Sequence, residues 1–215
     1  MDLFLIIDSI GVLVFAFCGA LKGVERHLDI LGIMTTGVVT ALGGGMIRDV
    51  LVNRLPVAIS TFYDMSLAVT GVLIACAVVV VKKRDYSTRS LVLFLDALGL
   101  AAFTATGAMV AYEAGLSVWG VVLLASLTGC GGGAVADLLC NQVPGVLRED
   151  FYAVCCMGGA LSFYACVYMG IGVEGASFLC NVVVFSLRIL AIFCAWRLPK
   201  LPCLHERHEK QHWWK

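Results

Sequence analysis

Charged side chains are scarce in this chain: 14% of its 215 residues are Asp, Glu, Lys or Arg, while 60% are hydrophobic. The mean hydropathy is +0.95. Soluble domains carry about a quarter charged residues, so this composition excludes a water-soluble globule and indicates an integral membrane protein. The formal net charge is zero at neutral pH. No basic excess therefore points to nucleic acid as a partner.

Histidine is missing from the long apolar stretches, because all four histidines lie in connecting segments or near the C-terminus. A buried zinc or haem ligand set is therefore not expected, and we expect no metal and no cofactor. The chain also lacks a C-x-x-C pair. Nearly all of its ten cysteines lie in apolar stretches, where we expect them to pack as small apolar side chains.

Features of an enzyme are lacking as well. Neither glycine run is followed by the Lys-Ser/Thr pair of a nucleotide-binding loop. Asp49 and Asp137 could in principle form a proton-sharing dyad, but the adjacent Arg48 would keep both carboxylates ionised. We therefore expect no catalytic residues and no enzymatic activity.

Long apolar runs are what the chain has instead. Seven of them are long enough to cross a hydrocarbon core of about 30 Å as helices. Their limits are 3–22, 29–52, 62–82, 90–112, 115–140, 151–172 and 175–197. The fold class expected is therefore an all-α membrane protein with seven transmembrane helices.

Basic residues at the limits of these spans or outside them divide unequally between the two sides of the membrane. Arg54 stands alone on one side. The other side holds Lys22, Arg26, Lys82, Lys83, Arg84, Arg89, Arg148, Arg197, Lys200, Arg207, Lys210 and Lys215. Because basic residues favour the cytoplasm, we expect the N-terminus outside, the C-terminus inside, and the tail 198–215 at the cytoplasmic interface.

The chain repeats itself at an offset of 88 residues. Residues 8–79 align with 96–167 without a gap and share twenty identities. With three spans in each copy, the second copy must enter the membrane upside down. We therefore expect one transmembrane domain over 1–215, made of inverted repeats at about 3–82 and 90–172, with a seventh helix at about 175–197.

Triple glycines mark the densest part of the repeat. Gly43, Gly44 and Gly45 in the second span align with Gly131, Gly132 and Gly133 in the fifth. Each glycine costs about 1 kcal/mol relative to alanine inside a helix, so a compensating role is expected. Either small residues allow the helices to pack closely, or the helices break and turn backbone groups toward a hydrated path.

Charged residues lie within one helical turn of these glycines. Ionisable groups deep in a membrane normally pair with one another or line a hydrated cavity. Arg48 aligns with Ala136, so one guanidinium serves two carboxylates, and we expect it to pair with Asp137 or with its neighbour Asp49.

Three further charges allow two interpretations each. Asp8 and Asp96 occupy equivalent places at the starts of the first and fourth spans, at opposite mouths if the repeats are inverted. They either cap helix N-terminal regions or draw cations into two vestibules. Arg188 lies near the middle of the seventh span, where an ion pair, a contact between subunits and pore lining are all compatible with it.

Hydroxyl groups precede both glycine runs by one turn, at Thr40 and Thr128. Such a hydroxyl can replace part of an ion's hydration shell. It can equally bond to its own helix. Together with the glycine, Arg48, Asp49 and Asp137 positions, the two threonines complete the expected pore.

These motifs resemble the bacterial branch of the trimeric intracellular cation (TRIC) channel family, also labelled glycine-transporter-domain or UPF0126-like membrane proteins. The resemblance rests on GGGMIRDVL from Gly43, on the second glycine triplet with its aspartate, and on NQVPGVLREDFY from Asn141. It covers nearly the whole chain. Ala136 departs from the family pattern, which often has a basic residue there.

The resemblance implies a homotrimer in the bacterial inner membrane, in contact with membrane lipids. Each subunit would have its own pore for monovalent cations, chiefly K⁺ with Na⁺ as a second candidate, between the two glycine-kinked helices. We expect a passive potassium-permeable channel. The alternative is a secondary carrier for glycine or another small amino acid, because helix ends beside charges also suit a zwitterion.

Overall fold

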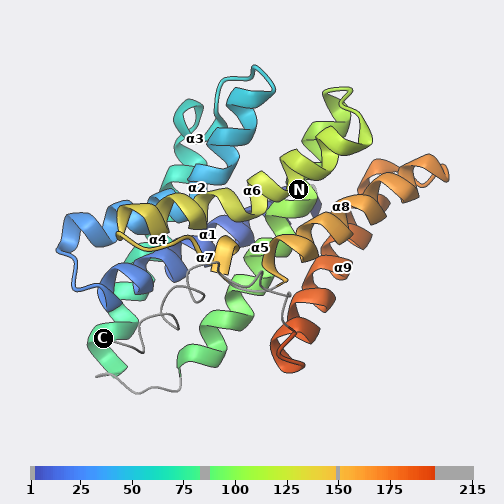
Figure 1. Cartoon of the computed structure of the whole chain (residues 1–215). Coiled ribbons are helices and arrows are strands. Elements are labelled where there is room, and N and C mark those ends of the chain that lie inside the picture. Colours follow the sequence, from blue (N-terminus) through green and yellow to red (C-terminus); the bar gives the residue numbers. More distant parts are fainter. Residues whose placement is uncertain (1–2, 83–87, 149–150, 197–215) are drawn as a thin grey trace, which may run out of the picture.

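A bundle of helices forms the part of the chain that the computed structural model describes, residues 3–82, 88–148 and 151–196 (Figure 1). The predicted tail 198–215 lies outside these residues. Seven helices are long and two have four residues. They are α1 (Leu3–Glu25), α2 (Ile30–Leu51), α3 (Val57–Ser60), α4 (Phe62–Lys82), α5 (Thr88–Glu113), α6 (Val118–Leu139), α7 (Gly145–Arg148), α8 (Tyr152–Tyr168) and α9 (Val173–Phe193).

Six of these helices are long and apolar enough to cross a membrane: α1, α2, α4, α5, α6 and α9. The prediction of an all-helical membrane protein is therefore confirmed. The predicted span 151–172 corresponds to α8, an apolar helix of 17 residues. At 1.5 Å per residue it extends about 25 Å, which is slightly less than a hydrocarbon core.

Helices α2 and α6 are both capped by a side chain at the N-terminus. The carboxylate of Asp29 accepts a hydrogen bond from the backbone N–H of Gly32 at 2.7 Å. At the equivalent place, the hydroxyl of Ser117 accepts from Gly120 N–H at 3.4 Å. Each side chain satisfies one of the free amides at a helix N-terminus. The cap also explains why α6 begins three residues after the predicted limit of 115.

Small residues and one aromatic pair fill the centre of the bundle. Phe15 of α1 and Phe103 of α5, which are equivalent in the repeat, meet edge to face with ring centroids 5.1 Å apart. Alanines make up much of the buried surface around them, on α1, α4, α5 and α6. Small side chains let helix backbones approach closely, which is how helices associate within a membrane.

Helices α2 and α6 cross each other at their glycine triplets. Both helices run without interruption through the glycines, so of the two alternatives that the sequence left open the helix break is not the one in this structure. At the crossing, a Cβ atom on Gly44 would overlap the backbone oxygen of Thr128. A Cβ on Gly132 would overlap the backbone oxygen of Thr40. Close packing is therefore what offsets the cost of these two glycines.

Helix α9, which follows the second repeat in the sequence, lies against helices of that repeat. It packs against α5 and α8, and α8 and α9 occupy one flank of the bundle, orange and red in Figure 1. Val184 of α9 is fully buried and fills the space beside Gly159 of α8. The seventh helix is thus an integral part of the packed core.

The crossing yields a direct test by alanine substitution. Gly44→Ala and Gly132→Ala should each destabilise the protein by about 1–3 kcal/mol, because the new methyl group meets backbone that cannot rotate away. Gly133→Ala is the matched control, because nothing lies within 4 Å of a Cβ at that position. It should be neutral or stabilising by up to about 1 kcal/mol.

Thermal unfolding of the detergent-purified variants measures these differences. Equal melting temperatures for the Gly44, Gly132 and Gly133 variants would mean that the crossing is not the tight contact described.

Candidate functional site

Two polar clusters flank the α2/α6 crossing. The Asp49 cluster contains Asp8, Arg48, Asp49, Val57 and Thr106, and the Asp137 cluster contains Lys22, Asp96, Asp137, Gly145 and Tyr152. Each has at its centre the aspartate that follows a glycine triplet. The clusters therefore bring together most of the charged residues that the sequence singled out.

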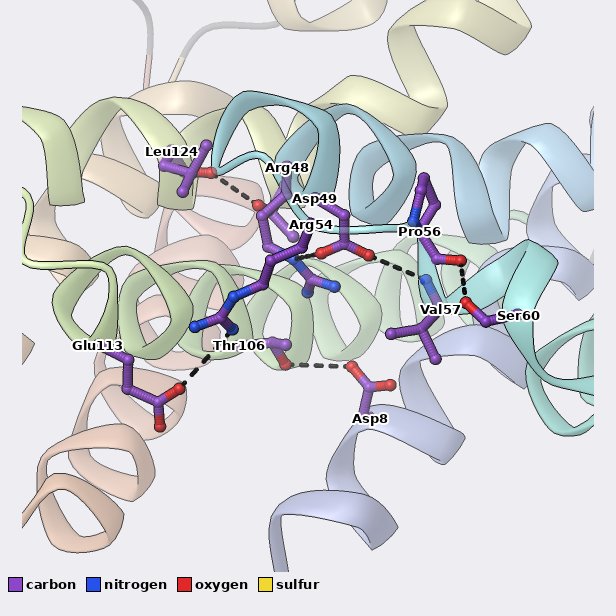
Figure 2. A network of polar contacts seen from close by, with 11 residues as sticks. Asp8, Arg48, Asp49, Arg54, Pro56, Val57, Ser60, Thr106, Glu113 and Leu124 are labelled. Carbon is purple, nitrogen blue, oxygen red and sulfur yellow. Dashed lines mark hydrogen bonds and ion pairs between the residues drawn. The ribbon is translucent and has the colours of Figure 1, made fainter.

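In the Asp49 cluster, Arg48 and Asp49 form a buried ion pair. The Nε atom of Arg48 lies 2.7 Å from Oδ1 of Asp49, and their side chains are 10% and 5% exposed. The other carboxylate oxygen of Asp49 accepts a hydrogen bond from Val57 N–H at 3.1 Å (Figure 2). Both oxygens are thus held, one by a guanidinium and one by the first residue of α3.

Asp8 lies beside this pair (Figure 2). Its carboxylate accepts a hydrogen bond from the Thr106 hydroxyl on α5 at 3.2 Å. Asp8 and Asp64 of α4 both interact electrostatically with Arg48. Arg48 thus contacts one carboxylate and attracts two others, and the Asp8 carboxylate binds a neighbouring helix rather than capping its own.

In the Asp137 cluster, the cation comes from a different helix. Lys22 of α1 places its Nζ atom 2.5 Å from Oδ1 of Asp137. Oδ2 accepts a hydrogen bond from Gly145 N–H at 2.7 Å. Val57 and Gly145 are equivalent in the repeat. The two aspartates therefore have the same arrangement of one cation and one backbone amide.

Of the two pairings expected for Arg48, the structure has the one with Asp49, and the pairing with Asp137 is wrong. The physical reason is that Lys22 already neutralises Asp137, while Arg48 stays on its own helix. Sequence reasoning missed Lys22 because it lies near the end of the first span, where it counts as a loop charge. Its long chain reaches back from that end into the bundle.

Asp96 is the partner of Arg188, the buried charge on α9. The Arg188 guanidinium lies 3.9 Å from an Asp96 carboxylate oxygen and 4.5 Å from the centre of the Tyr152 ring. Tyr152 donates its hydroxyl to the other oxygen of Asp96 at 3.1 Å. An ion pair within the subunit thus accounts for Arg188, which is 4% exposed. Tyr152 was not among the expected site residues.

A cavity of about 180 Å³ opens on the Asp137 side of the crossing. Its polar walls are formed by Lys22, Glu25, Thr40, Asp96, Asp137 and Tyr152. Gly133, which has free space beside it, also lines the cavity. The cavity thus joins one carboxylate cluster to the glycines at the crossing.

The two threonines bond to their own helices. Thr40 donates to the Thr36 carbonyl at 2.6 Å, and Thr128 donates to the Leu124 carbonyl at 2.7 Å. Each side chain also packs against a glycine of the neighbouring helix, Gly19 or Gly107. The self-bonded alternative therefore holds in this structure, although the Thr40 side of the crossing still borders the cavity.

Cysteines contribute no covalent link within the described residues. Six of the nine described cysteines are buried: Cys18, Cys130, Cys155, Cys156, Cys166 and Cys180. Among the described residues, no three His, Cys, Asp or Glu side chains are grouped so as to hold a metal ion. The chemistry of this site is therefore that of carboxylates, ammonium and guanidinium groups and helix backbone.

Comparison with known proteins gives consistent matches. A family model described as "Glycine transporter" matches residues 5–83 and 93–168. The "UPF0126 inner membrane protein YadS" of Escherichia coli strain K12 is 35% identical over 199 residues, which cover 91% of this chain and 93% of that protein.

Two solved structures share the fold. One, described as "Structural basis for conductance through TRIC cation channels", superposes with a TM-score of 0.85 at 32% identity and covers 94% of this chain and 98% of that chain. The second is described as "Crystal structures of the TRIC trimeric intracellular cation channel orthologue from Rhodobacter sphaeroides". It has a TM-score of 0.80 at 27% identity and covers 91% of this chain and 100% of that chain.

The ion-pair assignment is tested by double-mutant cycles on unfolding free energy. Arg48→Gln with Asp49→Asn, and Lys22→Met with Asp137→Asn, should each show coupling above about 1 kcal/mol, because the partners are in contact. Arg48→Gln with Asp137→Asn should be additive within about 0.5 kcal/mol. Strong coupling in this last cycle would mean that the two clusters share one cation after all.

Proposed function

This chain belongs to the family whose model is described as a glycine transporter and whose curated relatives are UPF0126 membrane proteins, and from that premise we propose that it is a passive channel for monovalent cations. It is a multi-pass integral protein of the bacterial inner membrane. The observation that carries the proposal is the superposition of nearly the whole chain on a TRIC cation channel, with a TM-score of 0.85. We propose a non-enzymatic, potassium-permeable protein.

We propose that the chain is a single transmembrane domain of two inverted repeats, about 3–82 and 90–172, followed by a seventh helix at about 175–197. In this arrangement α8 also crosses the membrane, as the last helix of the second repeat, and α9 is the seventh helix. The two segments matched by the family model begin 88 residues apart, at 5 and 93, which supports the repeat. The distribution of Lys and Arg supports an N-terminus outside and a C-terminus inside. In this orientation the Asp49 cluster faces outward and the Asp137 cluster inward.

The proposed ion path follows α2 and α6 through their crossing. Thr40, Thr128, both glycine triplets, Arg48, Asp49 and Asp137 border this path, with Asp8 and Asp96 at its outer and inner mouths. Carboxylates on both sides of the crossing favour cations. The contact of Gly44 and Gly132 with the facing backbone supports a closed path, in which conduction would require α2 and α6 to separate.

We propose a homotrimer in the lipid bilayer, in which each subunit carries its own path. The support is the likeness to a protein described as a trimeric cation channel orthologue. Both flanking clusters are completed by residues of a single chain, which is compatible with a separate path in each subunit.

A second candidate function is a secondary carrier for glycine or a similar small amino acid. Two observations favour it: the description of the family model, and a cavity on one side of a closed crossing, as in a carrier open to one side. The cavity also offers an ammonium group and carboxylates, the partners that a zwitterion needs.

Planar-bilayer recordings of the purified protein separate the two functions. In a K⁺ gradient we expect unitary currents that reverse near the K⁺ equilibrium potential, because carboxylates on both sides of the crossing exclude anions. Gly44→Leu should reduce these currents at least about tenfold, since a large side chain occupies the crossing. Saturable glycine uptake by proteoliposomes without unitary currents would reject the channel and support the carrier.

A further inference from the structure

The two halves neutralise their central aspartates with different cations. In the outer half, Arg48 is the residue directly before Asp49. In the inner half, the residue before Asp137 is Ala136, and the cation is Lys22 from α1. The position equivalent to Lys22 in the second repeat is Val110. The cationic partner of the central aspartate therefore comes from α2 itself in the outer half and from α1 in the inner half. The contacts of the two aspartates, one cation and one backbone amide each, are the same.

The space beside the third glycine of each triplet differs between the two halves. In the outer half, a Cβ atom on Gly45 would lie 3.7 Å from the Arg48 guanidinium. At the equivalent Gly133 nothing lies within 4 Å, and this glycine lines the cavity. The space beside Gly133, which corresponds to the space that the Arg48 guanidinium occupies beside Gly45, is therefore part of the inner cavity.

The side chains of Arg48 and Lys22 also differ in how freely they can move. The Arg48 side chain is 10% exposed and bound to the adjacent residue of its own helix, whereas Lys22 is 34% exposed and reaches Asp137 across a helix interface. A lysine ammonium on a flexible four-carbon stem can leave a carboxylate more readily than a buried guanidinium. The inner ion pair is therefore the more easily opened of the two.

We propose that Lys22 is a permeation-controlling residue: its ammonium group occupies a cation-binding position on Asp137 and competes there with the permeant ion. This inference rests on the proposed channel function. A monovalent cation entering the cavity meets a carboxylate whose Oδ1 atom is already bound to a tethered positive charge. Lys22 thus sets the barrier for cations that enter from the cytoplasm.

The test is the unitary conductance of Lys22→Met as a function of salt. Removing the ammonium leaves Asp137 with its negative charge, which concentrates cations in the cavity. At about 20 mM KCl the conductance for outward current should rise at least about twofold, and in about 1 M KCl the difference should disappear, because salt screens the charge. Lys22→Arg should stay close to the wild type.

A matched control and a rescue make the test specific. Arg26→Met removes one positive charge from the same mouth, but Arg26 binds Gln142 rather than a carboxylate, so its low-salt conductance should change little. Adding Ala136→Arg to Lys22→Met returns a cation to Asp137 through the cavity. The low-salt conductance should then fall back to the wild-type value.

The outcomes are distinguishable. Absence of cation currents in the wild-type protein would reject the proposed channel itself. A conducting wild type whose low-salt conductance is unchanged by Lys22→Met, or is raised equally by Arg26→Met, would overturn the role of Lys22 alone. A purely structural role would lower the melting temperature of Lys22→Met but leave the ratio of low-salt to high-salt conductance unaltered.

Discussion

The contact between α2 and α6 at Gly44 and Gly132 is the constraint on which the rest of the structure depends. Each glycine faces a backbone oxygen of the other helix, so no larger residue fits without separating the helices. This approach brings the two glycine triplets together and places the aspartate that follows each of them on opposite sides of one crossing. The position of one carboxylate cluster on each side of the crossing follows from this contact.

Buried charge is accommodated here by pairing within the subunit. Asp49, Asp137 and Asp96 each have a cationic partner, respectively Arg48, Lys22 and Arg188. In a membrane such pairing avoids the large cost of an isolated charge, and backbone amides and a tyrosine hydroxyl complete the coordination. The same pairs reduce the net charge along the proposed path, so conduction depends on how readily each pair opens.

Sequence reasoning predicted the helical membrane fold because long apolar runs have few other stable states in lipid. It also identified the central residues, because the 88-residue repeat aligned both glycine triplets and both aspartates. It could not decide between a broken helix and close packing, since glycine permits both. Nor could it assign partners: Lys22, Tyr152 and Arg188 reach their carboxylates across helix interfaces, and no local pattern encodes those contacts.

The central claim is that water and cations reach the glycine crossing between α2 and α6. It is tested most directly by thiol labelling of single engineered cysteines after the native cysteines have been replaced. Gly133→Cys and Ala134→Cys, which line the cavity, should react with a charged reagent applied from the cytoplasmic side. Leu123→Cys, on an exposed apolar face of α6, should stay unreactive in the bilayer. Cavity positions that remain unlabelled under conducting conditions would contradict the account.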